Sequence, residues 1–149
     1  MKLLVACDHG GFTLKDELLH YLKQRDDVTL INLGVDSADS VDYPAMAARL
    51  CTALLAGEGE RGLLLCGTGI GISMAANRFP GIRAALCHDE TTARLSREHN
   101  DANILVLGGR TTGYETARAI LDIWLTTPFA GGRHLRRIQQ LDLLPNKPA

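Results

Sequence analysis

The sequence predicts one α/β domain of three layers, a five-stranded parallel sheet with helices on both faces and a basic helix at the C-terminal end. Short apolar segments of strand type alternate along the chain with longer segments whose apolar residues recur at helical spacing. No linker, repeat or low-complexity stretch divides residues 1–149, and this length suits a single domain. Such alternation favours a parallel sheet joined by right-handed crossovers.

Three short apolar segments in the first half of the chain are the first predicted strands. They span residues 3–7, 28–33 and 63–66, and polar or glycine-rich residues follow each one. After the first strand, three leucines spaced four residues apart predict a helix. After the second, a polar loop at 34–42 leads to Pro44, which is favoured at the first position of a helix. The residues expected to be buried on these two helices are Leu14, Leu18 and Leu22, and Ala47, Leu50, Cys51 and Leu54.

The second half of the chain continues the same alternation. Pro80 and Gly81 turn the chain into a strand at 83–87, and Asp89 is placed to cap a helix that runs through Glu98. A fifth strand is predicted at 104–107. The predicted helix at 114–125 ends before Pro128 and buries Ala117, Ile120, Leu121 and Trp124. A short basic segment follows at 131–141, and about 142–149 are expected to form a flexible tail.

The third predicted strand ends at Cys66 in a loop with glycine at every second position. Gly67, Gly69 and Gly71 allow positive φ angles and a close approach of backbone N–H groups to a ligand. The next residues, 73–77, are compatible with a helix, whose N-terminus would add a positive dipole end. A loop of this kind suits a phosphate, a carboxylate or a developing oxyanion.

Three familiar phosphate loops do not fit this stretch. Ile72 stands where a dinucleotide-binding G-x-G-x-x-G loop needs its third small residue, and no Lys-Ser or Lys-Thr pair follows as in a Walker loop. A cysteine phosphatase loop would need an arginine at the position of Ile72. Cys66 therefore has two interpretations: a strand-end cysteine beside backbone amides that favour its thiolate, or a small buried hydrophobic residue. The loop alone leaves both open.

Ligands of parallel α/β sheets bind beyond the carboxyl ends of the strands. This rule brings together Asp8-His9, the Cys66 loop, His88-Asp89 and Gly108-Gly109-Arg110, because each follows a strand directly. Asp8 and His9 precede two glycines, which favours a functional site, although an Asp there also caps a helix and a His there is also found in solvent. Arg110 after two glycines suits an oxyanion or a phosphate better than an ordinary surface position.

Other polar residues have structural explanations when taken alone. His99 at the end of the fourth helix is favoured by the helix dipole, with Asn100 in a left-handed cap. Arg133 and Arg137 are four residues apart and so share one helix face, where they either hold one phosphate or, with Arg136, form a solvated basic face. The remaining histidines outside the strand ends, His20 and His134, are expected in solvent, and Trp124 in the core.

Composition excludes several classes of protein. The net charge of −1 argues against a strongly basic nucleic-acid binder, and no apolar run is long enough to span a membrane. The N-terminus enters a strand without a signal-peptide pattern, which predicts a cytoplasmic protein. The four cysteines lack C-x-x-C spacing, so neither a zinc site nor a disulfide framework is indicated.

Several ordered motifs together resemble the type B ribose-5-phosphate isomerase family, which includes galactose-6-phosphate isomerase subunits. The motifs cover nearly the whole chain and are Cys7-Asp8-His9-Gly10-Gly11-Phe12, Asp42-Tyr43-Pro44, the stretch 66–77, His99-Asn100-Asp101 and Gly131-Gly132-Arg133-His134. The resemblance implies a Rossmann-like fold, a homodimer or a dimer of dimers with sites between subunits, and no metal. It implies interconversion of an aldose phosphate with its ketose phosphate. One branch of the family has a glutamate base where this chain has Ile72, and it lacks the cysteine. Cys66 and His99 are both present here, so the sequence is similar to the cysteine-dependent branch.

The resemblance also implies a role for each motif residue. Cys66 would be the base that moves a proton between C1 and C2, and His99 would open the furanose ring. Thr68 and the amides of the loop would stabilise the enediolate, while Asp8 and Asn100 would hold sugar hydroxyls. The remaining implied residues are Gly67, Gly69, Ile70 and Gly71 in the loop, and His9, Arg110, Arg133 and Arg137 at the phosphate.

The chemistry that the Cys66 loop suggests by itself agrees with this reaction. A base beside an amide-lined loop is what proton abstraction next to a carbonyl requires, and the hydrogen leaves and returns as a proton, so no redox cofactor is needed. The expected substrate is ribose 5-phosphate, and ribulose 5-phosphate is its product. Allose 6-phosphate or galactose 6-phosphate is the alternative substrate, and a non-catalytic phosphosugar sensor is a more distant alternative that would not need Cys66.

Overall fold

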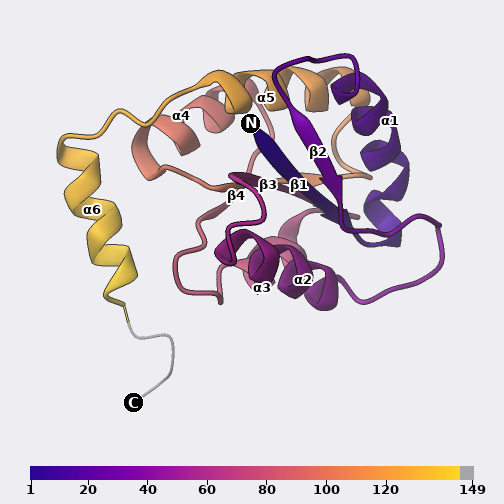
Figure 1. Cartoon of the computed structure of the whole chain (residues 1–149), viewed down its shortest axis with the longest axis horizontal. Coiled ribbons are helices and arrows are strands. Elements are labelled where there is room, and N and C mark those ends of the chain that lie inside the picture. Colours follow the sequence, from indigo (N-terminus) through magenta and orange to yellow (C-terminus); the bar gives the residue numbers. More distant parts are fainter. Residues whose placement is uncertain (145–149) are drawn as a thin grey trace.

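A computed structural model describes residues 1–144 and contains a five-stranded, entirely parallel sheet with strand order β2-β1-β3-β5-β4 (Figure 1). The predicted α/β class with helices on both faces is therefore confirmed. The strands are β1 (Lys2–Cys7), β2 (Thr29–Asn32), β3 (Arg61–Cys66), β4 (Ala84–Leu86) and β5 (Ile104–Gly108). The helices are α1 (Phe12–Leu22), α2 (Tyr43–Leu55), α3 (Ile70–Ala76), α4 (Glu90–Asn100), α5 (Tyr114–Thr126) and α6 (Arg133–Asp142), with a 3-10 turn at His9–Gly11.

The alternation of side chains along the central strands creates two separate cores. In β1, Leu3 and Val5 face a core formed with α1, α4 and α5, whereas Leu4 and Ala6 face a second core formed with α2 and α3. Trp124 of α5 is fully buried in the first core, as the sequence predicts. Cys66 belongs to the second core, so its side chain lies on the α2 and α3 face of the sheet.

The strand order places a topological switch point between β1 and β3. From β1 the chain moves outward to β2, and it then crosses back to form β3 on the other side of β1. The loops after β1 and β3 consequently leave the sheet side by side and enter helices on opposite faces. Ligands of open α/β sheets bind at this point, beyond the carboxyl ends of the strands.

Most differences from the predicted elements concern their ends. Helix α4 continues two residues beyond Glu98, because its last turn is held by the Asp101 N–H, which donates to the carbonyl oxygens of Arg97 and Ser96. On α2 the buried position is Ala53, and Leu54 is only half-buried, because the helix face turns toward the sheet at residue 53. Helix α6 extends through Asp142, so the expected tail begins later, and 145–149 lie outside the described residues.

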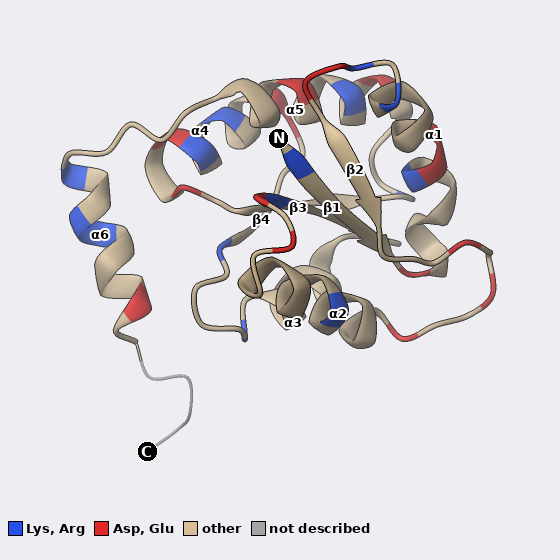
Figure 2. Ribbon diagram, viewed as in Figure 1, with Lys and Arg blue, Asp and Glu red and all other residues tan. Residues whose placement is uncertain are grey.

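Helix α6 stands apart from the three layers and packs against α4 (Figure 1). Figure 2 shows Lys and Arg positions on α6 and on the neighbouring part of α4, whereas the loop between β2 and α2 carries acidic positions. Leu135, Leu141, Leu143 and Leu144 are exposed on α6 or directly after it. None of the helices in residues 1–144 has both the length and the apolar composition needed to cross a bilayer.

Candidate active site

The loops that follow β1, β3 and β5 are in direct contact at the carboxyl edge of the sheet. The Gly109 N–H donates to the Cys66 carbonyl oxygen at 2.8 Å, and the Arg110 N–H donates to the Gly67 carbonyl oxygen at 2.9 Å. A Cβ atom at Gly10 would lie 2.8 Å from the Gly67 nitrogen, and one at Gly109 would lie 2.5 Å from the Gly10 carbonyl oxygen. These two positions need glycine because the loops approach each other more closely than any side chain permits.

The Cys66 thiol lies at the centre of this contact, at the end of β3. Its side chain is 5% exposed, and its Sγ accepts a hydrogen bond from the Gly69 N–H at 3.0 Å. Gly69 adopts a left-handed conformation with φ of 78°, which turns its N–H back toward the sulfur. A backbone donor aimed at sulfur stabilises negative charge there, so Cys66 is more than an isolated core thiol.

The loop after Cys66 also offers donors around the sulfur. Within the described part of the chain, the N–H groups of Gly67, Thr68 and Gly71 donate to no acceptor. The Thr68 hydroxyl is exposed and accepts the Ile70 N–H at 3.3 Å. Such unpaired donors near the Cys66 sulfur form a cradle for an oxyanion.

Asp8, His9 and Arg110 surround the same loop, as the sequence predicts from their position after strands. Asp8 is 6% exposed, and its Oδ1 accepts the Gly11 N–H at 3.1 Å, so it caps the 3-10 turn. His9 is half-buried, and its Nδ1 accepts the Val41 N–H at 3.3 Å. The exposed Arg110 side chain lies over Gly67, with Nη1 3.5 Å from where a Cβ at residue 67 would be. We call Asp8, His9, Arg110 and the loop 66–71 the carboxyl-edge group.

His99 and Asn100 lie at the opposite edge of the sheet. Helix α4 begins after the carboxyl end of β4 and ends next to the start of that strand, where the Asn100 carbonyl oxygen accepts Arg83 Nε–H at 3.0 Å. An eleven-residue helix is about 16 Å long. Since α4 starts at the edge of the sheet where Cys66 lies, its last residues are separated from Cys66 by a distance of that order. The left-handed cap is Asp101, with φ of 45°, and not Asn100 as expected. Asn100 is the last helical residue because Asp101 holds Arg97 and Arg83 through its carboxylate.

Helix α6 brings Arg133 and Arg137 to the same end of α4. The His134 ring stacks on His99 with centroids 4.2 Å apart and planes inclined by 12°. The prediction that His134 is merely solvated is therefore wrong: it is half-buried by this stack. Desolvation, followed by the charges of His99, Arg133 and Arg137, lowers the pKa of His134. We call His99, Asn100, Arg133 and Arg137 the helix-end group.

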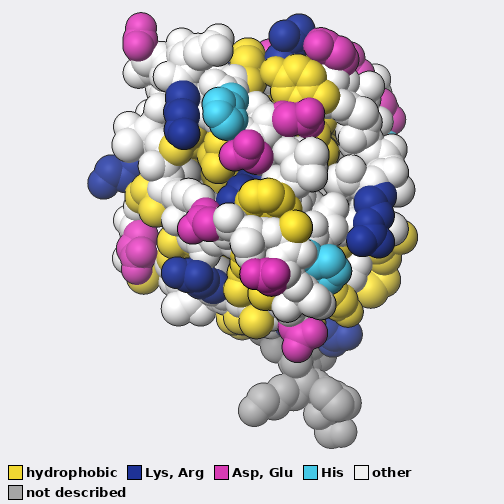
Figure 3. Space-filling model, turned by 90° about the vertical axis from the view of Figure 1, so that its right-hand side faces the viewer, with side chains coloured by type: hydrophobic (Ala, Val, Ile, Leu, Met, Phe, Trp, Pro, Cys, Tyr) yellow, Lys and Arg dark blue, Asp and Glu magenta, His cyan; other side chains and the backbone are white. Residues whose placement is uncertain are grey.

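The structure thus divides the predicted site residues into two groups at opposite ends of one chain. In Figure 1 the strands point toward the carboxyl-edge group on the right, and α6 with the end of α4 lies on the left. Figure 3 views the molecule from the right-hand side of Figure 1, where acidic, hydrophobic and basic side chains are interspersed. One chain alone does not bring Cys66 and His99 together.

Three contributors to the carboxyl edge were not among the predicted site residues. Lys15 on α1 is 2% exposed, and its signal in the sequence is its position on the same helix face as Leu18 and Leu22. Val41 acts through its backbone N–H, for which no side-chain pattern exists. Tyr43 also closes the loop, since a Cβ at Gly71 would lie 2.7 Å from its ring.

Comparison with known proteins gives matches along nearly the whole chain. A model of the ribose/galactose isomerase family matches residues 3–141. The chain is 43% identical over 146 residues to the Escherichia coli protein named ribose-5-phosphate isomerase B, covering 98% of this chain and 97% of that protein. It is 46% identical over 142 residues to a putative sugar phosphate isomerase of Bacillus subtilis, covering 95% of each.

Solved structures agree with the sequence relatives. Ribose-5-phosphate isomerase B of Clostridium thermocellum superposes with a TM-score of 0.93 at 48% identity, covering 95% of both chains. The ribose 5-phosphate isomerase of Thermotoga maritima gives the same TM-score at 49% identity, covering 96% of this chain and 98% of that one.

Proposed function

The chain belongs to the ribose/galactose isomerase family, and from this membership we propose that it interconverts ribose 5-phosphate and ribulose 5-phosphate. The relatives whose names specify this activity match it over its full length. The observation that carries the mechanism is the hydrogen bond of the Gly69 N–H to the Cys66 sulfur at 3.0 Å. It fixes the sulfur at the end of β3, next to unpaired backbone donors.

Cys66 is the base of the proposed reaction. Its thiolate takes the proton from C2 of the open-chain aldose, and the C1 carbonyl oxygen becomes negative. The proton of the C2 hydroxyl then passes to O1, and the Cys66 thiol returns its proton to C1, which gives the ketose. The hydrogen moves as a proton throughout, so the chemistry requires no redox cofactor.

The loop amides stabilise the charge that develops on oxygen. The Gly67, Thr68 and Gly71 N–H groups have no other acceptor among residues 1–144, and Thr68 adds its hydroxyl. The Gly69 N–H is already used by the sulfur, and the Ile70 N–H by Thr68, so these two residues shape the loop rather than bind the enediolate. Donors fixed before the reaction stabilise the intermediate without reorganisation.

A second copy of the chain supplies the helix-end group to this site. Ring opening needs a proton carrier near the substrate, and His99 lies about one helix length away in its own chain. A two-fold axis that sets the end of α4 against the carboxyl edge of the partner joins the two groups twice. The exposed leucines on α6 give this helix an apolar surface that a partner would cover.

The shared site has polar side chains that bind the sugar hydroxyls and basic side chains that bind the phosphate. Asp8 and the partner's Asn100 hold sugar hydroxyls. His9 and Arg110 approach the phosphate from one chain, while Arg133 and Arg137 approach it from the other. A remote phosphate anchor fixes C1 and C2 over the thiolate, and its binding energy is used for positioning.

The experiment that tests this function compares three substrates with EDTA-treated enzyme. We expect turnover of ribose 5-phosphate well above that of allose 6-phosphate and galactose 6-phosphate. The family name covers both ribose and galactose isomerases, so a preference for a hexose phosphate would transfer the same mechanism to the longer sugar. No turnover of any of the three would contradict the proposed function.

A further inference from the structure

Lys15 is a buried charged residue that the isomerase mechanism does not use. Its side chain is 2% exposed, and its Nζ donates to the Val35 carbonyl oxygen at 2.5 Å. The Phe12 ring lies 5.3 Å from Nζ, and the Asp36 carboxylate 3.6 Å from it. Removing an ammonium group from water is costly, so a buried lysine needs contacts that offset this cost.

The contacts of Lys15 point to the loop between β2 and α2. Asp36 is 82% exposed and therefore contributes little as an ion-pair partner. The nearby Cys7 thiol is not a charged partner, since burial raises its pKa. The principal contact of the ammonium is consequently the backbone of Val35, at the start of the loop 34–42.

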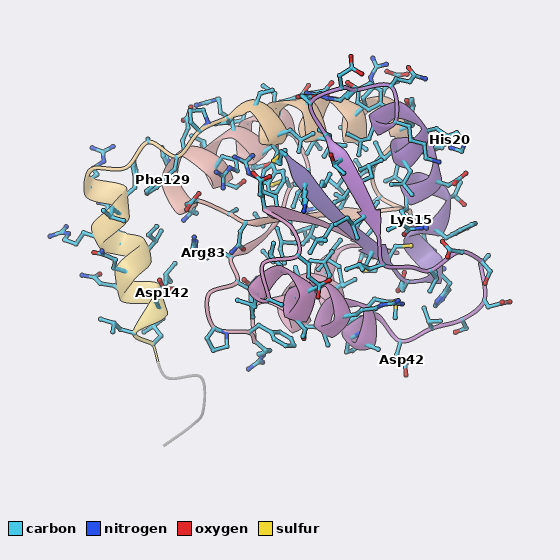
Figure 4. The ribbon with its side chains drawn as sticks, in the orientation of Figure 1. Lys15, His20, Asp42, Arg83, Phe129 and Asp142 are labelled. Carbon is cyan, nitrogen blue, oxygen red and sulfur yellow. The ribbon has the colours of Figure 1, made fainter. Side chains whose placement is uncertain are left out.

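This loop reaches from the anchor at Lys15 to the carboxyl-edge group. At its start, the Gly34 carbonyl oxygen accepts the Cys7 N–H at 2.9 Å. Near its end, the Val41 N–H donates to His9 Nδ1 at 3.3 Å. Figure 4 shows Lys15 beside this loop, with Asp42 at the other end, where α2 begins.

The Val41 contact determines which nitrogen of His9 carries a proton. A ring nitrogen that accepts an N–H has no proton of its own, so the Nδ1 of His9 is unprotonated. Neutral His9 must then carry its proton on Nε2 and present Nε2–H as a donor. A donor is what a phosphate oxygen requires, whereas the opposite tautomer would present a lone pair on Nε2.

We propose that Lys15 is a positioning residue: by holding residues 34–42 through Val35, it keeps the Val41 N–H on His9 and so fixes the Nε2–H tautomer that binds phosphate. The role in phosphate binding rests on the proposed function, whereas the tautomer does not. An apolar side chain at position 15 would leave the Val35 carbonyl oxygen without its donor.

The test combines histidine NMR with kinetics. In wild-type enzyme labelled with ¹⁵N-histidine, with the His9 signals identified by their loss in His9→Asn, we expect protonated Nε2 and unprotonated Nδ1. In Lys15→Met we expect a mixture of the two tautomers and a rise in KM for ribose 5-phosphate of about tenfold, with kcat changed by less than about twofold. A merely structural role would not move the tautomer signal.

Arg25→Met is the matched control. Arg25 bonds the carboxylates of Asp27 and Asp122, lies beyond the far end of α1, and has no hydrogen bond or ion pair with the loop 34–42. We expect it to lower stability while the His9 tautomer and KM stay as in wild type. If Lys15→Met does not fold, the second variant is Val41→Pro, which removes the N–H that bonds His9 and leaves Lys15 in place. This variant must also give a mixture of the two His9 tautomers.

Two results would overturn the inference. One is a wild-type His9 protonated on Nδ1, and the other is an unchanged tautomer and KM in a folded Lys15→Met enzyme. If wild type fails to turn over ribose 5-phosphate, the proposed function fails instead, and the His9 spectra still decide whether Lys15 acts through the loop.

Discussion

At the scale of single residues, the site depends on where a side chain is missing as much as on where one is present. Gly10 and Gly109 allow three loops to touch, and only this contact places the Gly67 backbone beside the loop that carries His9. The sequence predicts the functional importance of these glycines from their position after strands. It does not indicate which atoms they approach, because that follows from the strand order.

Gly109→Ala is expected to damage the site more than the fold. Its Cβ would lie 2.5 Å from the Gly10 carbonyl oxygen, so the loops after β1 and β5 must separate. We expect a loss of about 1–3 kcal/mol in unfolding free energy, typical of overpacking, and a larger fractional loss of kcat. Urea unfolding and steady-state assays measure the two effects.

Gly113→Ala is the control for that substitution. Nothing lies within 4 Å of a Cβ at this position, and its φ is −70°. Its stability should stay within about 0.5 kcal/mol of wild type, with unchanged kcat. Equal effects of both substitutions would mean that the contact between the loops has no special role.

Arg137→Ala tests the basic region of the proposed shared site. Removing a charged hydrogen-bond donor to phosphate costs about 1.5–3 kcal/mol, so KM should rise roughly tenfold to a hundredfold while kcat falls less. Arg136→Ala removes the same charge from the neighbouring exposed position of α6 and should leave KM nearly unchanged. If the two variants behave alike, the helix is an ordinary solvated basic surface.

At the scale of elements, the alternation of strands and helices is readable from sequence because each has its own apolar period. The central strands are apolar on both faces, and the structure places them as predicted. The length of α4 and the identity of its left-handed cap were not predictable, since both depend on Arg83, which reaches Asp101 through a tertiary contact and adds to the local pair of Arg97 with Asp101. The packing of α6 on α4 includes the stack of His99 and His134, for which local sequence gives no signal.

The contact between α4 and α6 should weaken in acid. The pKa of His134 is lowered in the folded chain, so the unfolded chain binds the proton at a higher pH than the folded chain does. Stability therefore rises with pH across the interval between the lowered pKa and the ordinary value, and it is lost as pH falls through that interval. We expect wild type to lose more stability than His134→Gln between about pH 7.5 and about pH 5.5, measured by urea unfolding. Parallel curves for the two proteins would contradict this effect.

At the scale of the whole molecule, the fold separates the two groups of predicted site residues. A parallel sheet sends the loops after its strands to one edge and the ends of its helices to the other. Cys66 and His99 are therefore kept apart by topology rather than by a local detail. Sequence motifs identify both residues, but only the strand order and the direction of α4 reveal that one chain cannot unite them.

Mixing two inactive variants tests whether subunits share the site. Cys66→Ala and His99→Asn should each be inactive as homodimers. In a mixed dimer, one site combines the intact Cys66 of one chain with the intact His99 of the other, so random exchange should restore about a quarter of wild-type activity. Mass spectrometry confirms that mixed dimers form. Mixed dimers without recovered activity would show that the two residues act within one chain or in separate steps.

The measurement that most directly tests the account is turnover of ribose 5-phosphate by wild type and Cys66→Ala, with binding of the sugar phosphate measured by calorimetry on both. We predict that the variant binds with similar affinity and loses about 10²–10⁴-fold or more in kcat, because a positioned base contributes on that order. A Cys66→Ala enzyme that turns over ribose 5-phosphate at a rate close to wild type would remove Cys66 as the base and contradict the account.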